Sequence, residues 1–237
     1  ADKNNIEGFY PSTIDDLVLE QVKSLEPDLI IVVAYGIILP LKFLNIPKYG
    51  CINIHVSLLP RWRGAAPIEH ALLKGDEKTG ISIIRISSKL DAGDILMQES
   101  LILNKDINSE DLTINLTNLG KQTLINALPL LFENKLIGVK QDETKVTYAN
   151  KFLPEDRKID FNNSSNDVYN HIRAHGPKPG SWFTYKGERI KIIKAKKINE
   201  LGESSTILNK EFMIACKDGA ILPLLIQREG KRVVSLD

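Results

Sequence analysis

The chain has 237 residues, 43% of them hydrophobic and 26% charged, and a formal net charge of +1. This composition is typical of a globular protein in water, and no apolar run is long enough to cross a bilayer, so a membrane protein is not expected. The length favours one larger domain with a smaller appendage, and we expect a monomer. Only Cys51 and Cys216 are present, and no secretory signal is visible, which favours the cytoplasm but leaves one disulfide open.

Charge is distributed unevenly along the chain. Residues 1–155 hold 16 Lys and Arg against 20 Asp and Glu, a balance of −4, whereas residues 156–237 hold 15 against 10, a balance of +5. A solvated surface with a chance bias explains this pattern as well as an anionic partner such as nucleic acid does.

Hydrophobic periodicity predicts alternating helices and strands in the first part of the chain. Residues 28–34 form a continuous, largely β-branched run that is typical of a strand buried on both faces of a parallel sheet. A helix over residues 13–25, capped by Thr13, precedes this strand, and its partner strand is expected before residue 1. The predicted fold class is α/β, with a doubly wound, mostly parallel sheet. Further strands are expected at 51–56, 79–86 and 95–103, and helices at 65–75 and from 108 or 109 to Pro129, where the proline should end or kink the helix.

The second part of the chain has a different period. Residues 137–155 are polar and irregular, which predicts a linker between a larger domain at 1–136 and a basic domain at 156–237. After a short helix at 165–174, several short strands with glycine turns predict a small β-barrel of the OB type. These strands are expected at 181–185, 188–197, 206–208, 212–216 and 220–227.

Two polar residues on the strand at 51–56 could carry chemistry. Asn53 and His55 are two positions apart, so they share one face of the strand at about 7 Å. Asp91 lies in the turn after the next predicted strand, and loops that follow neighbouring parallel strands meet at one edge of the sheet. We therefore expect Asp91 to reach His55, although a lone histidine at a strand end is more often structural.

This trio favours one reaction class. The imidazole can carry a proton, the carboxylate can hold the imidazole, and the amide can donate to an oxyanion. No Ser or Cys is placed for attack, because Cys51 lies in an apolar strand that disfavours a thiolate. Direct acyl transfer to an amine needs no such nucleophile. The histidines at 70, 171 and 175 have no cysteine or carboxylate at ligand spacing, so no metal site is expected.

Several motifs carry a family resemblance. Asn-Ile-His at 53–55, Ser-Leu-Leu-Pro at 57–60 and Leu-Asp-Ala-Gly-Asp at 90–94 resemble the folate-dependent formyltransferases. Segments 33–40, 57–68 and 141–149 are similar, within that family, to the members that act on an aminoacylated tRNA. The resemblance implies that 10-formyltetrahydrofolate donates its formyl group to the α-amine of initiator methionyl-tRNA. It also implies catalytic roles for Asn53, His55 and Asp91, and a catalytic domain at 1–136.

The resemblance further implies two binding surfaces. The folate would be received by three loops, through Ile37, Leu39, Ser57, Leu58, Leu59, Pro60, Ser88 and Leu90. Arg61 and Arg63 flank Trp62 and would guide the acceptor end of the tRNA. For Trp62 itself, a part in this contact and a role as a lid are equally favoured. The strand at 188–197 carries cations largely on one face, which favours phosphate contact through Lys191, Lys194 and Lys196. A soluble edge strand protected by lysines is the alternative interpretation.

Two other functions stay open. A folate-dependent formyltransferase or hydrolase with a small acceptor shares the Asn, His and Asp, but predicts neither the Arg-Gly-Ala-Ala-Pro motif at 63–67 nor a basic barrel. A non-catalytic RNA-binding module on an inherited scaffold predicts the basic domain, but the intact trio counts against it.

Overall fold

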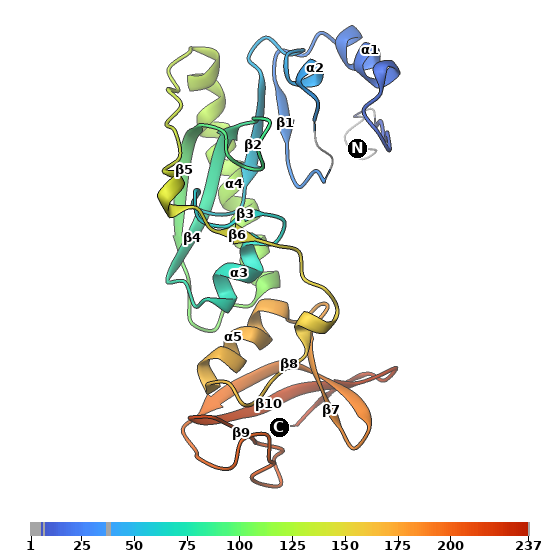
Figure 1. The fold of residues 1–237 in the computed structure, drawn as a ribbon, viewed down its shortest axis with the longest axis vertical. Helices are drawn as coiled ribbons and strands as arrows, with labels where there is room; N and C mark the ends of the chain where they lie inside the picture. The colour runs from blue at the N-terminus through green and yellow to red at the C-terminus, as the bar shows by residue number, and fades with distance from the viewer. Residues whose placement is uncertain (1–5, 7, 37–38, 237) are drawn as a thin grey trace.

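A computed structural model describes residues 6, 8–36 and 39–236, and two sheets lie one above the other along its long axis (Figure 1). The helices are α1 (Asp16–Ser24), α2 (Leu41–Leu44), α3 (Pro67–Leu73), α4 (Ser109–Phe132) and α5 (Ser165–His175). The strands of the first part are β1 (Ile30–Val32), β2 (Cys51–His55), β3 (Arg63–Gly64), β4 (Lys78–Arg85), β5 (Ile95–Ile102) and β6 (Tyr148–Ala149). Those of the second part are β7 (Ser181–Tyr185), β8 (Glu188–Ile198), β9 (Ile214–Cys216), β10 (Gly219–Arg228) and β11 (Val233–Ser235).

The first sheet has the strand order β1-β2-β4-β5. β1 pairs with β2 in parallel, as the α/β fold class predicts, whereas the β2–β4 and β4–β5 pairings are antiparallel. The prediction that β1 is buried on both faces is wrong for the described sheet, because β1 is its edge strand and Ile31 is 40% exposed.

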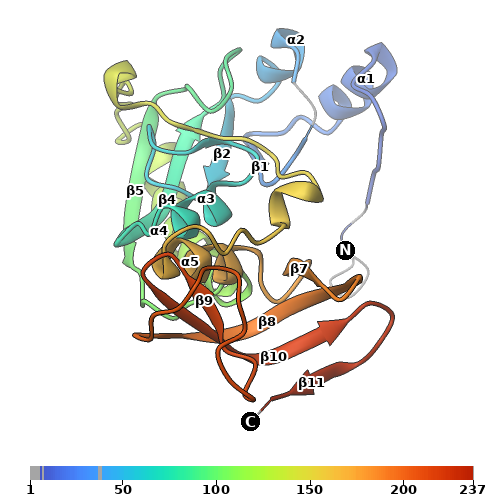
Figure 2. The ribbon, with the colours of Figure 1, turned by 60° about the horizontal axis from the view of Figure 1, so that its bottom comes forward.

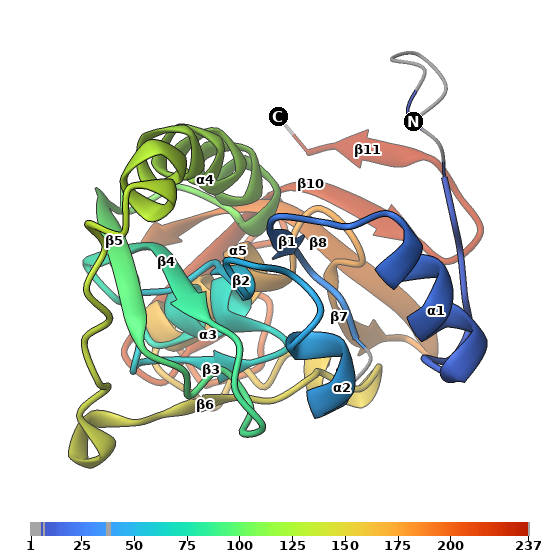
Figure 3. The ribbon, with the colours of Figure 1, turned by 90° about the horizontal axis from the view of Figure 1, so that it is seen from above.

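The two faces of this sheet have different roles. Helix α4 covers one face of the sheet (Figure 3). Ile52, Ile81 and Ile83 are fully buried and belong to one core cluster with Leu112 and Leu116 of α4. Side chains alternate between the faces of a strand, so Asn53 and His55 point away from this core. The β3–β6 pair lies on that opposite side, and it is there that the polar residues of the sheet meet.

The helix ends follow their capping residues. Asn108 caps α4 by accepting from the Asp111 N–H at 2.9 Å, as predicted. α4 then continues through Pro129 to Phe132, so of the two predicted effects of this proline, a kink or an end of the helix, the end does not occur. Pro129 falls in the last turn, where only three residues follow it. α1 begins at Asp16 and is capped by Asp15, not by Thr13.

The second part is an antiparallel sheet with the order β11-β10-β8-β7, and β9 adds to β10 (Figure 2). Among the described residues, no pairing joins β11 to β7. The strand predicted at residues 206–208 is only an isolated bridge between Ile207 and Ile214. Strand β11, in contrast, is present but was not predicted.

Within the described ranges, no helix combines the length and the apolarity needed to cross a membrane.

Helix α5 holds the two parts together. It packs against α3, and the buried Arg173 donates to the carbonyls of Leu72 and Ile107, both at 3.2 Å. The Tyr169 hydroxyl donates to Asp106 at 2.8 Å, and burial with this bond raises the pKa of Tyr169 to about 12. Polar side chains of α5 thus hydrogen-bond to acceptors on the first part of the chain. These bonds position the second sheet relative to the first.

Candidate active site

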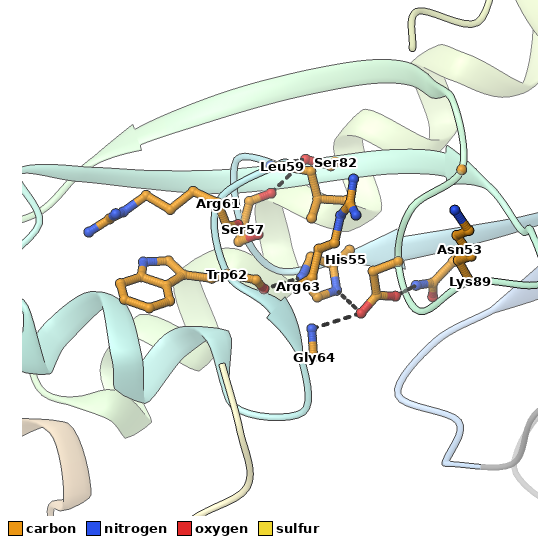
Figure 4. A network of polar contacts seen from close by, with 12 residues as sticks. Asn53, His55, Ser57, Leu59, Arg61, Trp62, Arg63, Gly64, Ser82 and Lys89 are labelled. Atoms are coloured by element: carbon orange, nitrogen blue, oxygen red, sulfur yellow. Dashed lines mark hydrogen bonds and ion pairs between the residues drawn. The ribbon is translucent and has the colours of Figure 1, made fainter. Parts of the chain in front are cut away.

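Asn53 and His55 on β2 face one carboxylate, that of Asp91 (Figure 4). The Asn53 amide nitrogen donates to Asp91 Oδ1 at 3.3 Å, and His55 Nδ1 lies 3.6 Å from Asp91 Oδ2. The imidazole is 6% exposed and the carboxylate side chain 13%, so the pair is largely shielded from water. The structure therefore brings the three residues of the predicted trio together.

Asp91 reaches His55 by a route that the sequence did not predict. Since β4 runs antiparallel to β2, Arg85 at the end of β4 lies beside Ile52, near the start of β2. The turn between β4 and β5 then folds back over the sheet towards His55. Asp91 has φ +46, and a Cβ on Gly93 would overlap the Arg85 carbonyl, so the turn is tight and needs glycine there.

The second nitrogen of His55 is also engaged. Nε2 lies 2.8 Å from the carbonyl oxygen of Trp62, which can only accept, so Nε2 carries a hydrogen. Nδ1 faces the Asp91 carboxylate on the other side of the ring, so the imidazole lies between the Trp62 carbonyl and that carboxylate.

Two contacts to Asp91 come from groups that sequence analysis did not single out. The backbone N–H of Gly64 donates to Asp91 Oδ2 at 2.9 Å. The side-chain amide of Gln141 donates to the carbonyls of Asp91 and Gly93, at 2.7 and 2.8 Å. The only sequence signal for Gln141 is its place in the motif at 141–149.

The loop at 57–60 is held by polar side chains from the sheet. Ser82 Oγ donates to the Ser57 carbonyl at 2.6 Å and accepts from the Leu59 N–H at 3.0 Å, while Gln98 donates to the Leu59 carbonyl at 2.9 Å. Ser57 and Leu59 are buried, and the Ser57 hydroxyl donates to the Arg61 carbonyl. Leu58 and Pro60 are partly exposed. Folate binding by this loop stays a prediction.

The other predicted folate residues lie apart from this loop. Ser88 and Leu90 are exposed on the turn that carries Asp91, and Leu90 is 63% exposed. Leu39 packs partly buried beside Phe43. Ile37 lies outside the described residues. Leu90 thus gives the site an apolar surface next to the residue that carries the Asp91 carboxylate.

Arg61 and Arg63 make ion pairs within the chain. Arg61 donates twice to Asp76, at 2.9 and 2.6 Å, and lies over the Trp62 ring; this pairing raises the pKa of Arg61. Arg63 is 2% exposed and donates to Gln141 and Glu143. Trp62 is buried, its ring lies beside that of His70 on α3, and its indole N–H donates to Asp76. Contact of either arginine with tRNA stays a prediction.

Three cations of β8, Lys191, Lys194 and Lys196, lie on the outer face of the second sheet. Ile190, Ile192 and Ala195 are buried, and the register with β10 shifts twice, which leaves Ile193 of β8 and Leu224 of β10 without a partner in the ladder. This irregularity interrupts the alternation, so Lys191 before it and the exposed Lys194 and Lys196 after it share one face. The predicted segregation of cations from apolar residues is thus present.

A hollow of about 220 Å³ adjoins Lys191 on this face. Its charged lining includes Arg157, Arg189, Lys191 and Arg228 against Glu229. Arg228 is paired with Glu188, but the buried Nε of Arg189 has no hydrogen-bond partner, and its guanidinium lies 4.0 Å over the Trp182 ring. The hollow is suited to an anion.

Three further titratable side chains are buried away from this site, those of Cys51, Cys216 and His175. Cys51 and Cys216 are both free, so they do not form the disulfide that the sequence left open. Both are buried, and burial raises the pKa of each thiol to about 11. Burial lowers the pKa of His175 to about 4. Within residues 6, 8–36 and 39–236, no three His, Cys, Asp or Glu side chains are grouped so as to hold a metal ion.

Two family models cover most of the chain. The formyl transferase model matches residues 5–128, and the formyl transferase C-terminal domain model matches residues 151–237. A methionyl-tRNA formyltransferase from Ehrlichia canis is 40% identical over 100% of this chain and 78% of the relative. One from Methylococcus capsulatus is 40% identical over 91% and 71%. The chain belongs to the methionyl-tRNA formyltransferase family.

Solved structures share the fold of this formyltransferase. The methionyl-tRNA formyltransferase of Clostridium thermocellum has a TM-score of 0.61 at 23% identity and covers 78% of this chain and 79% of its own. A sugar 3N-formyl transferase, solved in the presence of dTDP and 5-N-formyl-THF, has a TM-score of 0.71 at 21% identity and covers 89% and 77%. The α/β fold with a C-terminal domain of antiparallel strands is thereby confirmed.

Proposed function

We propose that this chain transfers the formyl group of 10-formyltetrahydrofolate to the α-amine of initiator methionyl-tRNA, without a covalent enzyme intermediate. The observation that carries this proposal is the convergence of Asn53 and His55 on Asp91 in a chain of the methionyl-tRNA formyltransferase family. Both ring nitrogens of His55 face acceptors and no placed nucleophile adjoins them, which favours stabilisation of charge over attack.

The roles follow from the contacts. The amine attacks the formyl carbon, so a new carbon–nitrogen bond forms while the bond to N10 of the folate breaks. The Asn53 amide has a second hydrogen that is free to donate to the developing oxyanion, and a protonated His55 adds positive charge nearby. Asp91 Oδ1 accepts only the long bond from Asn53, so it is the group best suited to take the amine proton and return it to N10.

For the substrates, two surfaces of the chain are suitable. The pterin would lie against the exposed Leu90, next to Asp91, with Leu39, Leu58 and Pro60 as further lining. The tRNA backbone would lie on the outer face of β8, over Lys191, Lys194 and Lys196, with a phosphate in the hollow beside Arg189. Arg61, which is 44% exposed, could exchange its Asp76 partner for the acceptor end.

The decisive experiment follows formyl transfer by the full chain from 10-formyltetrahydrofolate to charged initiator tRNA, free methionine, an amino sugar and water. We expect transfer to the charged tRNA alone. Asp91→Asn, His55→Ala and Asn53→Ala should each lower kcat/KM by about 100- to 1000-fold, because each removes charge stabilisation or proton transfer. Circular dichroism checks that the variants are folded. Transfer to a small acceptor alone, or tRNA binding without turnover, would overturn the proposal.

A further inference from the structure

The linker between the two parts sends one side chain into the active site. Gln141 is 9% exposed, and its amide nitrogen donates to the carbonyls of Asp91 and Gly93, at 2.7 and 2.8 Å. Its amide oxygen accepts from Arg63 Nε at 2.9 Å. Both donor hydrogens and the acceptor of this amide are therefore used, and all three bonds are made to residues of the site or of the loop beside it.

The turn that Gln141 binds depends on hydrogen bonds from other segments for its conformation. Asp91 has φ +46, a left-handed conformation that costs any residue other than glycine some free energy, although aspartate adopts it more readily than most. The two carbonyls bound by Gln141 flank Ala92, so the amide bridges the turn directly after the strained residue. Since the carboxylate of Asp91 is aimed by Gly64 N–H and Asn53, a shift of the backbone would move it relative to His55.

Arg63 determines which way the Gln141 amide points. Its guanidinium is 2% exposed, and because Nε can only donate, the amide oxygen must face Arg63 and the amide nitrogen must face the turn. The two terminal nitrogens of the Arg63 guanidinium donate to the Glu143 carboxylate, at 2.8 and 3.3 Å. These bonds lower the pKa of the Glu143 carboxyl. The two residues adjoining Arg63 contact the trio through their backbones, Trp62 at His55 and Gly64 at Asp91.

We propose that Gln141 is a positioning residue for formyl transfer: oriented by Arg63, it holds the Asp91 turn so that the carboxylate faces His55 and Asn53. This inference rests on the proposed role of Asp91. It makes the linker a working part of the active site, since the residue that fixes the catalytic turn belongs to the segment that leads to the second domain.

The test uses the full chain with Gln141→Met, which keeps the length but removes all three bonds, and Gln141→Glu, which keeps the acceptor for Arg63 but turns a carboxylate towards two carbonyls. A displaced catalytic group costs turnover more than binding, so we expect kcat to fall by about 10- to 100-fold while KM for each substrate changes less than about 3-fold. Gln122→Met on α4, an exposed site, is the matched control and should leave both constants unchanged. Urea unfolding at the assay temperature checks that each variant is folded under the conditions of the assay.

A double variant separates positioning from a general structural effect. If Gln141 acts through Asp91, then Gln141→Met in an Asp91→Asn background should lower kcat by less than about 3-fold further, whereas independent effects would multiply. Wild-type kcat in either folded Gln141 variant, or multiplicative loss in the double variant, would overturn the inference. Failure of the proposed function would look different, because wild-type protein would then not formylate methionyl-tRNA at all.

Discussion

Gly64 shows how far the backbone itself takes part in this site. Its N–H donates to Asp91 Oδ2, its φ is +120, and a Cβ at this position would lie 2.7 Å from the Ala149 carbonyl. A side chain would therefore be strained by its own backbone and would push against β6. The only residue that fits both conditions and still offers the N–H at this point is glycine.

We expect Gly64→Ala to lower both stability and turnover. The left-handed backbone and the contact with Ala149 should together cost about 2 to 4 kcal/mol of unfolding free energy, and movement of the N–H away from Asp91 should lower kcat by about 10-fold or more. Urea unfolding and steady-state formyl transfer measure the two effects.

Gly187 offers a matched control for this substitution. It has φ +80 in the turn between β7 and β8, but a Cβ at this position would have no neighbour within 4 Å, so Gly187→Ala carries the backbone strain without the clash. It should cost about 1 to 2 kcal/mol and leave kcat unchanged. Equal effects of the two substitutions on turnover would show that the Gly64 N–H has no role in the site.

At the residue scale, the sequence predicted that the side chains of Asn53, His55 and Asp91 meet, but not which backbone groups join them. Asn53, His55 and Asp91 could be found because their side-chain chemistry and the two-residue period of a strand are written in the sequence. The Trp62 carbonyl and the Gly64 N–H could not, because every residue has such groups. Gln141 lies 50 residues from Asp91 along the chain, and only the folded structure pairs them.

At the scale of elements, α5 carries the buried histidine that should make stability depend on pH. His175 is 3% exposed, and its pKa is lowered to about 4, first by burial and then by the nearby His171 and Arg157. In the unfolded chain the same residue titrates near its ordinary value of 6.5. Between these values the unfolded chain binds more protons, so the folded state loses stability as the pH falls.

We expect His175→Phe to remove this pH dependence. Between pH 7 and pH 5, protonation of His175 in the unfolded chain should lower the unfolding free energy of the wild type by about 2 kcal/mol. The phenylalanine variant lacks this contribution, so its unfolding free energy should fall by about 2 kcal/mol less over the same range. Urea unfolding at pH 5, 6, 7 and 8 measures the difference, and the pH 8 values give the effect of packing alone. Parallel stability curves for the two proteins over this range would mean that His175 is not held neutral.

The elements themselves were largely predictable where periodicity decides them. Asn108 caps α4, and Pro67 stands at the first position of α3, as their sequence preferences indicate. Strand direction was not predictable: the expected meeting of Asp91 and His55 assumed parallel neighbours, whereas β4 is antiparallel to β2 and a folded-back turn makes the contact. Pairing partners are set by the whole sheet, which local sequence does not encode.

For the whole molecule, charge separation between the two parts is the property that bears on the tRNA. Lys191, Lys194 and Lys196 share the outer face of β8 because the register with β10 shifts twice around Ile193, which interrupts the alternation of the strand. Sequence analysis could count these charges, but the simple two-residue period places Lys191 and Lys194 on opposite faces. The bulge, seen only in the pairing register, brings them to one face.

We expect Lys194→Gln together with Lys196→Gln to weaken binding of initiator tRNA to the full chain and to flatten its salt dependence. Each phosphate contact that is lost should reduce the slope of log K against log salt concentration by about 0.7 to 0.9, so the pair should reduce it by about 1.5. Lys105→Gln with Lys121→Gln, two exposed lysines of the first part, makes the same change of net charge and is the control. Binding measured between about 50 and 200 mM salt, a range over which phosphate contacts weaken strongly, gives both slopes. If the two double variants have the same slope, the lysines of β8 act only through overall charge and do not contact the phosphates.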